Sequence, residues 1–583
     1  MAADSTIQRA IQDAREGRLD AAIASLRFLV RRQPGNLDAL QALAMLLVQS
    51  GQTEQALAHL TRAAALAPRV PAYRNNLANA LMGLGRHREA AVELRKALEI
   101  DPRYELAWLG LAIASTGAGD LAGAIDACER GGALRAGWAA LARAHANALE
   151  AADRVDDAIT VLERAIAGNA NDHELRAAHL RMLNYATRPA SEVFEAHRAY
   201  GASLGGAASA PPAAPRPDGA PLRIGVLSAD LRTHSVGSFT EPWIAAIHGS
   251  DALRAGVELI AFSANPPNPS DRVETRLRRH FDRWIEAAAM DDATLGRAIR
   301  DARLDLLIEL SGHTAGSRLG ALTPKPAPVI VTATGYPNTT GHPSVDLRIV
   351  DSITDPPGSE SLATERLLRL DPCFLCYGPP ADAPDPALPS GDGPIVFGSF
   401  NLSSKISADT VALWSEVLSQ VPDAQLLAKS KALAGDLARG HFLARLEAAG
   451  IARARVEIVA YTPSIEAHLA LYRRVHIALD TVPYNGTTTT CEALWMGVPV
   501  VVLEGDRHAA RVGASLLAAA GLPEFIARDG TAYARIAADL ARDATRLADL
   551  RATLRARLSA SPLTDRSAYA TRLLAALRAA AAG

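Results

Sequence analysis

Apolar and polar residues alternate with a helical period over the first third of the chain, and this pattern recurs every 34 residues. Glycine, alanine and proline keep the 34-residue spacing at Gly17, Gly51, Gly85 and Gly119 (with Asp153 in the next place), at Ala22, Ala56, Ala90, Ala124 and Ala158, and at Pro34, Pro68 and Pro102. Glycine suits a turn with positive φ, alanine lets two helices approach closely, and proline ends a helix. The pattern predicts about five helix–turn–helix units between Ile7 and Asp172.

These units resemble the tetratricopeptide repeat. The resemblance implies a superhelix whose concave face binds peptides, so protein or peptide partners are expected there. A spacer that binds no ligand is the alternative interpretation. Helical sequence continues through 173–201 and gives way at 201–221 to a stretch rich in Gly, Ala and Pro, which predicts a linker.

The pattern changes at Leu222, where short apolar runs rich in β-branched residues alternate with helical segments. The predicted strands form two groups, the first at 222–230, 257–264, 304–312 and 327–335, the second at 393–400, 424–430, 455–460, 476–480 and 498–505. We therefore predict an α + α/β protein with a repeat array at 1–200, a linker at 201–221 and two facing Rossmann-like domains at 222–380 and 381–583. A ligand is expected between the C-terminal edges of the two sheets. The helical tail at 563–582 could cross back to the first of these domains.

Composition excludes several classes of protein. The chain has 583 residues and a net charge of −2, so it lacks the basic excess of a protein that binds nucleic acid through bulk charge. Its longest uncharged stretch, 326–345, contains four prolines and is no membrane-spanning helix. The four cysteines are too few for a disulfide framework and no secretory signal is evident, so a cytoplasmic protein without membrane contact is expected.

The segment 480–505 carries the most specific chemistry. A predicted strand ends at Asp480, a turn follows, and the threonines of 487–490 open the next helix. Hydroxyls and free N–H groups at a helix N-terminus favour an anion. Glu492, one turn later, can accept two hydrogen bonds from the hydroxyls of a ribose. Together they predict a nucleoside diphosphate site, and ordinary N-capping by threonine is the alternative.

Motifs along most of the chain resemble glycosyltransferase family 41, the protein O-glycosyltransferases with a tetratricopeptide N-terminus. They are LRIGVLSADLRTHSVGSF (222–239), IELSGHTAG (308–316), TGYPNTTGHPSVDLRIVDSITDPP (334–357), CFLCYGPP (373–380), GSFNLSSKIS (398–407) and TTTTCEALWMGVP (487–499). Within the family they look most like the SPINDLY branch, the protein O-fucosyltransferases, which is related to the O-GlcNAc transferase branch. The resemblance implies a GT-B fold and an inverting, metal-independent glycosyltransferase that moves one sugar from a nucleotide-sugar to Ser or Thr of proteins, with no other cofactor.

The donor that the resemblance implies is GDP-fucose, with UDP-N-acetylglucosamine as runner-up. The O-GlcNAc transferase branch typically has His-Thr-Thr and then Asp in the nucleotide loop, where this chain has Thr487, Thr488, Thr489 and Glu492. A Gln and a Lys of that branch are replaced here by Leu402 and Ile465. These departures argue against a uridine-type base site.

Two residues are predicted to be catalytic. Lys405 follows the strand at 393–400, where its ammonium can reach a β-phosphate and, with Thr488 and Thr489, stabilise the departing diphosphate. His234 follows the first strand, and a histidine facing the cleft there could orient the acceptor hydroxyl or accept its proton. A solvated surface lysine is the alternative for Lys405.

Five further positions are expected at the cleft from the resemblance alone. His468 matches a family position by the nucleotide base, and Gly335 and Tyr336 lie where the backbone would approach the sugar. His280 and His313 match family positions near the cleft, and either could simply orient a loop.

Three alternatives stay open at the level of sequence. Cys373 and Cys376 form a C-x-x-C that we interpret as structural, because no second pair exists to complete a Cys₄ zinc site; a redox or metal-binding role is the alternative. For the whole chain, one alternative is a small-molecule nucleotide-sugar enzyme (a glycan transferase or an epimerase) on the same fold, and another is a non-catalytic repeat scaffold. The repeat array argues against the first, and Lys405, His234 and the threonine segment argue against the second.

Overall fold

The computed structural model describes residues 2–205, 219–389 and 393–582, and the chain divides into two compact units, Met1–Leu175 and Arg176–Gly583. Most of the predicted linker lies outside the described residues, at 206–218. Its first residues belong to helix α12 (Ala190–Ser203), and strand β1 (Leu222–Ser228) begins where the linker was predicted to end.

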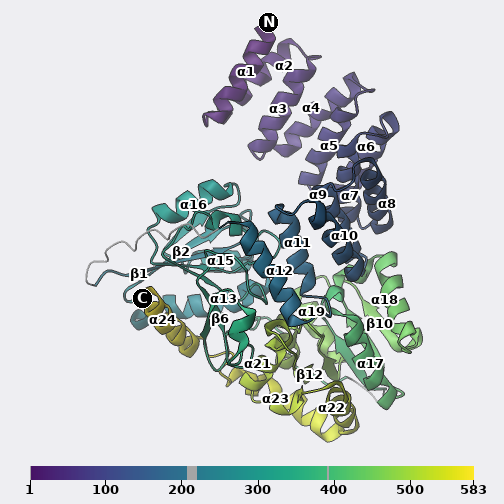
Figure 1. Ribbon diagram of the computed structural model, residues 1–583, viewed down its shortest axis with the longest axis vertical. Helices are drawn as coiled ribbons and strands as arrows, with labels where there is room; N and C mark the ends of the chain where they lie inside the picture. Colours follow the sequence, from purple (N-terminus) through teal and green to yellow (C-terminus); the bar gives the residue numbers. More distant parts are fainter. Residues whose placement is uncertain (1, 206–218, 390–392, 583) are drawn as a thin grey trace. The chain divides into compact units, whose positions relative to one another are not determined.

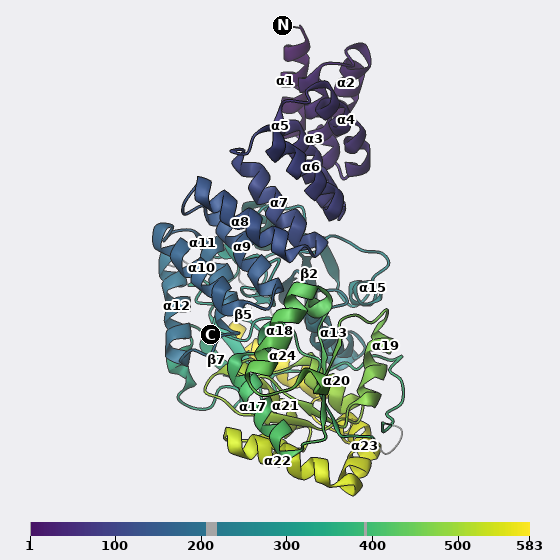
Figure 2. The ribbon, with the colours of Figure 1, turned by 90° about the vertical axis from the view of Figure 1, so that its right-hand side faces the viewer.

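The first unit is a row of helices in which each packs against the next (Figure 2). They are α1 (Ala2–Arg15), α2 (Leu19–Arg32), α3 (Leu37–Gln49), α4 (Thr53–Leu66), α5 (Pro71–Gly83), α6 (His87–Ile100), α7 (Glu105–Ala118), α8 (Leu121–Leu134), α9 (Ala139–Ala151) and α10 (Val155–Gly168). The next helix, α11 (His173–Leu183), crosses the boundary between the two units. The predicted helix pairs are therefore present throughout the array.

The residues that keep the 34-residue spacing have the roles that their chemistry predicts. The repeat glycines have positive φ, from 71° to 84°, and a Cβ added at any of them would meet no atom within 4 Å, so the backbone conformation alone selects glycine. Asp153 adopts the same conformation with φ of 63°. All five repeat alanines are fully buried, as expected where helices approach closely: Ala22, Ala56, Ala90, Ala124 and Ala158.

The second unit contains two parallel sheets. The first has the order β3-β2-β1-β4-β5-β6-β7, with β2 (Val257–Ser263), β3 (Arg283–Glu286), β4 (Leu306–Glu309), β5 (Val329–Thr332), β6 (Leu347–Val350) and β7 (Arg366–Arg369). The second has the order β10-β9-β8-β11-β12-β13, with β8 (Val396–Ser399), β9 (Gln425–Lys429), β10 (Val456–Val459), β11 (Ile477–Leu479), β12 (Val500–Leu503) and β13 (Ile526–Ala527). The predicted α/β architecture is confirmed, and β3, β6, β7 and β13 are additional short strands.

Helices connect these strands and cover the sheets. They are α13 (Ser235–His248), α14 (Asp251–Arg254), α15 (Arg272–Arg278), α16 (Asp292–Asp301), α17 (Ala408–Gln420), α18 (Asp436–Ala448), α19 (Ile465–Ala470), α20 (Thr488–Trp495), α21 (Val512–Ala519), α22 (Gly530–Arg542), α23 (Ala544–Ser559) and α24 (Arg566–Ala582). We call the parts around the first and second sheets the first and second α/β domains. The C-terminal helix α24 returns to the first α/β domain and packs on α13 and α14 (Figure 1).

Strand order defines where a ligand should bind. In each sheet the order reverses once, between β1 and β4 in the first and between β8 and β11 in the second. Loops that leave neighbouring strands at such a reversal diverge and leave a crevice at the carboxyl edge. The loop after β8 carries Lys405, and the loop after β11 leads to the threonines of α20.

The helices after the array belong to the second unit, although the sequence groups them with the repeats. The Tyr336 hydroxyl accepts a hydrogen bond from Asn184 (2.9 Å) and donates one to the Leu180 carbonyl (3.1 Å). Arg507 of the second α/β domain donates to the carbonyls of Ala186 (2.8 Å) and Arg188 (2.9 Å). The α11–α12 segment is therefore fixed to both α/β domains.

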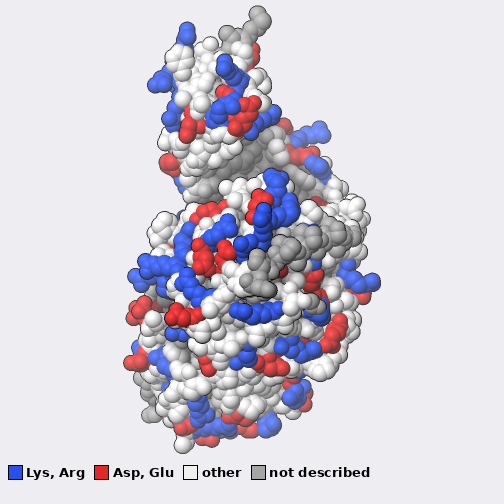
Figure 3. Space-filling view, turned by 90° about the vertical axis from the view of Figure 1, so that its left-hand side faces the viewer, with Lys and Arg blue, Asp and Glu red and all other residues white. Residues whose placement is uncertain are grey.

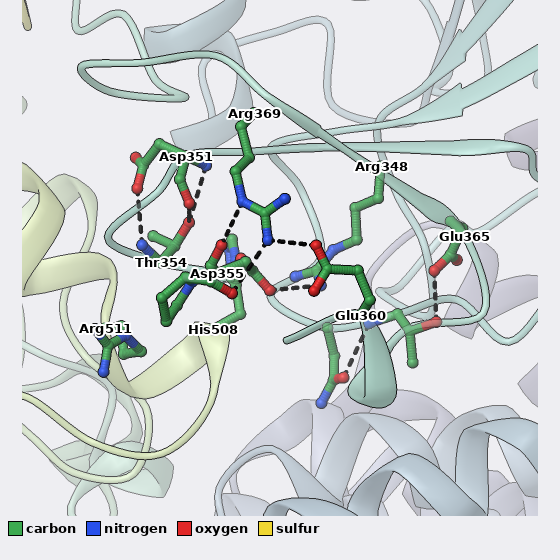
Figure 4. A network of polar contacts seen from close by, with 12 residues as sticks. Arg348, Asp351, Thr354, Asp355, Glu360, Glu365, Arg369, His508 and Arg511 are labelled. Carbon is green, nitrogen blue, oxygen red and sulfur yellow. Dashed lines mark hydrogen bonds and ion pairs between the residues drawn. The ribbon is translucent and has the colours of Figure 1, made fainter. Parts of the chain in front are cut away.

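A buried polar network joins the two α/β domains (Figure 4). Asp355, after β6, lies 2.5 Å from Nδ1 of His508 and 3.6 Å from Arg348, and all three side chains are buried. Burial opposes ionisation of Asp355, yet His508 and Arg348 outweigh it and hold the pKa of this carboxyl well below its usual value. Nearby, Ser515 donates to Asp351 across the same boundary (2.5 Å).

Three observations bear on the sequence-based interpretation of charge, membrane spans and cysteines. Basic and acidic side chains are interspersed over the face seen in Figure 3, in keeping with the small net charge. Among the described residues, no helix has the length and apolar character needed to cross a membrane. Cys373 and Cys376 are buried free thiols, and burial raises the pKa of each to about 12, which fits a structural role.

Candidate functional site

Lys405 lies at the reversal point of the second sheet, at the end of a short 3-10 helix that follows β8. Its ammonium donates to the carbonyl of Asn485 (2.9 Å) and lies 3.6 Å from the centre of the Tyr484 ring. The side chain is buried, and burial lowers its pKa to about 8, against the opposing effect of Asp480. Lys405 is therefore no solvated surface lysine, because its side chain is buried and its ammonium is hydrogen-bonded inside the protein.

Asp480 is the buried carboxylate opposite this cation. It follows β11, and its Oδ1 accepts from the backbone N–H groups of Thr481 (2.8 Å) and Gly486 (2.6 Å). Burial raises the pKa of Asp480 to about 6, while these bonds and Lys405 favour the ionised form. The sequence marked Asp480 only as the end of a strand. Its position at the carboxyl end of a buried strand, before a Gly-containing turn, was the signal that could have identified it.

The N-terminus of α20 supports an anion site. Within the described chain, Thr487 occupies the N-cap position without a capping hydrogen bond from its side chain, and the buried Thr488 hydroxyl has no hydrogen-bond partner. Thr489 donates instead to the side chain of Asn401, in the Lys405 loop (3.0 Å). Ordinary N-capping therefore does not account for these threonines, and the helix N–H groups stay available to a ligand.

Glu492 of α20 and His468 of α19 form a second pair beside this site. Nε2 of His468 lies 3.0 Å from Oε2 of Glu492, and both side chains are buried. Nδ1 of His468 is buried with no partner among the described residues. Lys429, at the end of β9, is half-buried, and burial lowers its pKa against the opposing effect of Glu492. Lys429 was not predicted, although it ends a strand beside the reversal point.

His234 lies in the first α/β domain, at the N-cap of α13. Its Nδ1 accepts from the backbone N–H of Val236 (3.3 Å) and lies 3.6 Å from Asp230. The side chain is 41% exposed, and burial of the rest lowers its pKa, partly offset by Asp230. A neutral ring that accepts at Nδ1 carries its proton on Nε2.

The four remaining predicted residues lie in the first α/β domain. The Tyr336 side chain is buried against α11 and α12, and a Cβ at Gly335 would lie 1.6 Å from the Leu310 carbonyl oxygen, so only glycine fits there. His313 is buried, contacts the Thr340 carbonyl (2.7 Å) and has its pKa lowered to about 4 by burial. His280 is half-buried after α15, 5.0 Å from the His248 ring. The structure thus brings together Lys405 with the residues of α20 and His468.

The family comparison fits this site. The model of glycosyltransferase family 41 matches residues 210–377 and 387–573. The chain belongs to glycosyltransferase family 41. A tetratricopeptide repeat model matches residues 14–80 and 81–148, so the helix pairs of the first unit are tetratricopeptide repeats.

Two plant proteins are similar over about three fifths of this chain. A probable UDP-N-acetylglucosamine–peptide N-acetylglucosaminyltransferase SPINDLY from Arabidopsis thaliana is 38% identical over 362 residues, 61% of this chain and 39% of that protein. The protein of the same name from Solanum lycopersicum is 40% identical over 349 residues, 59% of this chain and 37% of its own length. The chain thus spans about two fifths of the curated relatives.

A solved structure extends the comparison to the repeats. The O-GlcNAc transferase of Thermobaculum terrenum, solved as a lysine-to-methionine variant, is 33% identical, with a TM-score of 0.79 over 87% of this chain and 96% of that one. This match covers repeats and α/β domains alike, so the GT-B arrangement of two Rossmann-like domains after a repeat array is shared.

Proposed function

We propose that this chain is an inverting protein O-glycosyltransferase that moves a single sugar from a nucleotide-sugar to Ser or Thr of protein acceptors. The observation that carries the proposal is Lys405, a buried cation beside the uncapped N-terminus of α20. A nucleoside diphosphate is the anion that such a pair of features suits at the reversal point of a Rossmann-like sheet. Membership of family 41 supports the same activity.

The proposed reaction is a single in-line displacement. The acceptor oxygen attacks the anomeric carbon, the bond from that carbon to the β-phosphate oxygen breaks, and the diphosphate leaves with the electron pair on the opposite face. Charge on the departing diphosphate is balanced by the Lys405 ammonium and by the N–H groups of α20. In this proposal these groups do the work for which other transferases use a metal ion.

His234 is the residue that we assign to the acceptor hydroxyl, whose proton passes to water or to an oxygen of the departing diphosphate. With its proton on Nε2, the ring can donate to an acceptor oxygen and orient it. To accept the proton at Nε2, the ring must first carry its own proton on Nδ1, facing Asp230 at 3.6 Å. Orientation needs no such tautomer change, so we favour it as the role of His234.

We infer GDP-fucose as the donor, with UDP-N-acetylglucosamine as the alternative. The SPINDLY-like residues Leu402, Ile465 and Thr487 support the first donor, whereas the names of the plant relatives contain the second. Incubation of the purified chain with both donors and cell proteins is expected to add a deoxyhexose, measured by intact mass. Calorimetry is expected to show tighter binding of GDP than of UDP. Addition of N-acetylhexosamine, or equal affinities, would contradict this donor.

The acceptor proteins are expected to bind the tetratricopeptide repeats. The array presents helices in a repeating arrangement, and such arrays bind extended segments along one face. This role is a proposal about partners of the protein, and it fits a transferase acting on polypeptides better than one acting on small molecules.

The pH dependence of the reaction is expected to reflect the ionisation of Lys405. Its pKa of about 8 means that the free enzyme loses this positive charge as the pH rises through 8. We expect kcat/KM to be constant near pH 7 and to fall about tenfold for each pH unit well above 8. Steady-state assays from pH 6 to 10 measure this. In Lys405→Met the alkaline decline should vanish from the residual activity, and a decline that persists there would assign it to another group.

A further inference from the structure

Two tyrosines to which the sequence assigned no role lie next to Lys405, the proposed leaving-group lysine. The Tyr484 ring lies under the Lys405 ammonium, with 3.6 Å between the nitrogen and the ring centre. On Tyr484 stacks the ring of Tyr185, with centres 5.7 Å apart and planes inclined by 15°. Tyr484 belongs to the loop after β11, whereas Tyr185 belongs to the segment between α11 and α12.

We propose that Tyr484 and Tyr185 are positioning residues for Lys405, and that the α11–α12 segment is thereby part of the nucleotide-sugar site. The inference rests on the proposed function of Lys405. A flexible four-carbon side chain must hold its ammonium toward the diphosphate, and a ring face fixes its position by attraction between the cation and the π-electrons. The Asn485 carbonyl fixes one of its three N–H directions, which leaves the others for a ligand.

Hydrogen bonds from three residues hold the stack of Tyr484 and Tyr185 in place. Thr481 donates to the Tyr484 carbonyl (2.7 Å), which fixes the backbone under the ring. On the other side, Arg507 donates to the carbonyls of Ala186 and Arg188, which follow Tyr185 in the chain. Asn184 bonds to Tyr336 of the first α/β domain (2.9 Å). Tyr185 thus has a fixed position relative to both α/β domains. Stacking on Tyr185 in turn fixes the position of the Tyr484 ring.

The ring face also affects the charge of Lys405. The charged group facing Lys405 is Asp480, whose carboxylate favours the ammonium form against burial. An aromatic face adds to that effect, so its loss should make the ammonium easier to deprotonate. If the role of Tyr484 were merely structural, its loss would not change the pKa of Lys405.

The test compares Tyr484→Leu with Tyr484→Phe, which keeps the ring and removes the hydroxyl. We expect Tyr484→Leu to lower kcat about tenfold with little change in KM for the acceptor, and to move the alkaline decline about half a unit to one unit lower. Tyr484→Phe should stay within about twofold of the wild type and keep its pH profile. Tyr185→Leu should show a smaller loss of kcat, and Tyr185→Phe none.

Additivity tests whether the two rings act as one. If Tyr185 acts through Tyr484, the double leucine variant should lose no more activity than Tyr484→Leu alone. Thermal melting of each variant identifies any that fails to fold, and the pH dependence of GDP binding gives a readout that needs no transfer. An unchanged rate and pH profile in a folded Tyr484→Leu would overturn the positioning role. Lack of transfer by the wild type would instead contradict the proposed function, while the GDP titration still tests the positioning.

Discussion

Lys405→Met is expected to lower the rate of sugar transfer by about 10²–10³-fold, because it removes a preorganised cation from the departing diphosphate. Methionine keeps the length and apolar stem of the lysine, so the loop before α17 retains its packing. Steady-state kinetics with saturating donor measure the loss in kcat. Calorimetry with GDP measures how much of it comes from ground-state binding of the nucleotide.

The stability of Lys405→Met should change much less than its activity. Burial holds the pKa of Lys405 at about 8, below the ordinary 10.5, so folding disfavours the charged form at pH 7 and methionine removes that cost. Asp480 loses its cation at the same time, so its pKa should rise above about 6 and it should take up a proton near neutral pH. We therefore expect a melting temperature close to that of the wild type. Lys431→Met, at an exposed lysine of the same domain, is the matched control and should leave both kcat and stability unchanged. Transfer by Lys405→Met within fivefold of the wild type would contradict the leaving-group role.

Local patterns predicted the parts of the fold that depend on local chemistry. The glycine spacing predicted the turns of the array because a positive φ is a property of one residue, as Gly17 and Gly119 show. The loops that carry Lys405 and the α20 threonines were placed correctly after strands for the same reason, since a strand and its following turn are contiguous in sequence.

The contacts that complete the site depend on strand order, which no local pattern contains. Lys405 and Asp480 meet because β8 and β11 are neighbours in the sheet, although β9 and β10 lie between them in the chain. Tyr185 was assigned to the repeat side of the predicted linker, and only the packing of α11 and α12 on the α/β domains brings it to Tyr484. Asp355 and His508 are 153 positions apart and belong to different domains. Their pairing could not be predicted from either segment alone.

Asp355→Ala is expected to destabilise the protein by about 3–5 kcal/mol, because it leaves the buried Arg348 cation without its carboxylate and the buried His508 ring without its hydrogen-bond partner. Arg348 already has a buried Nη2 without a partner within the described residues, so loss of Asp355 leaves more of this guanidinium unpaired. His508 loses the contact that ties the second α/β domain to the loop after β6 (Figure 4). Urea unfolding of the full chain at pH 7, followed by circular dichroism, measures the difference.

The pH dependence of this difference distinguishes an ionic contact from simple loss of packing. The pKa of Asp355 in the folded protein lies well below the ordinary 3.8, so its ionisation stabilises the fold above about pH 4. As the pH falls below 4, the wild type loses this contribution and the deficit of Asp355→Ala should shrink. Asp371→Ala is the matched control: this exposed carboxylate of a neighbouring loop binds Ser352 of its own domain (2.7 Å), and its loss should cost about 1 kcal/mol. A deficit of Asp355→Ala that equals the control, or that stays constant from pH 7 to 3, would show that the Asp355 charge does not hold the two domains together.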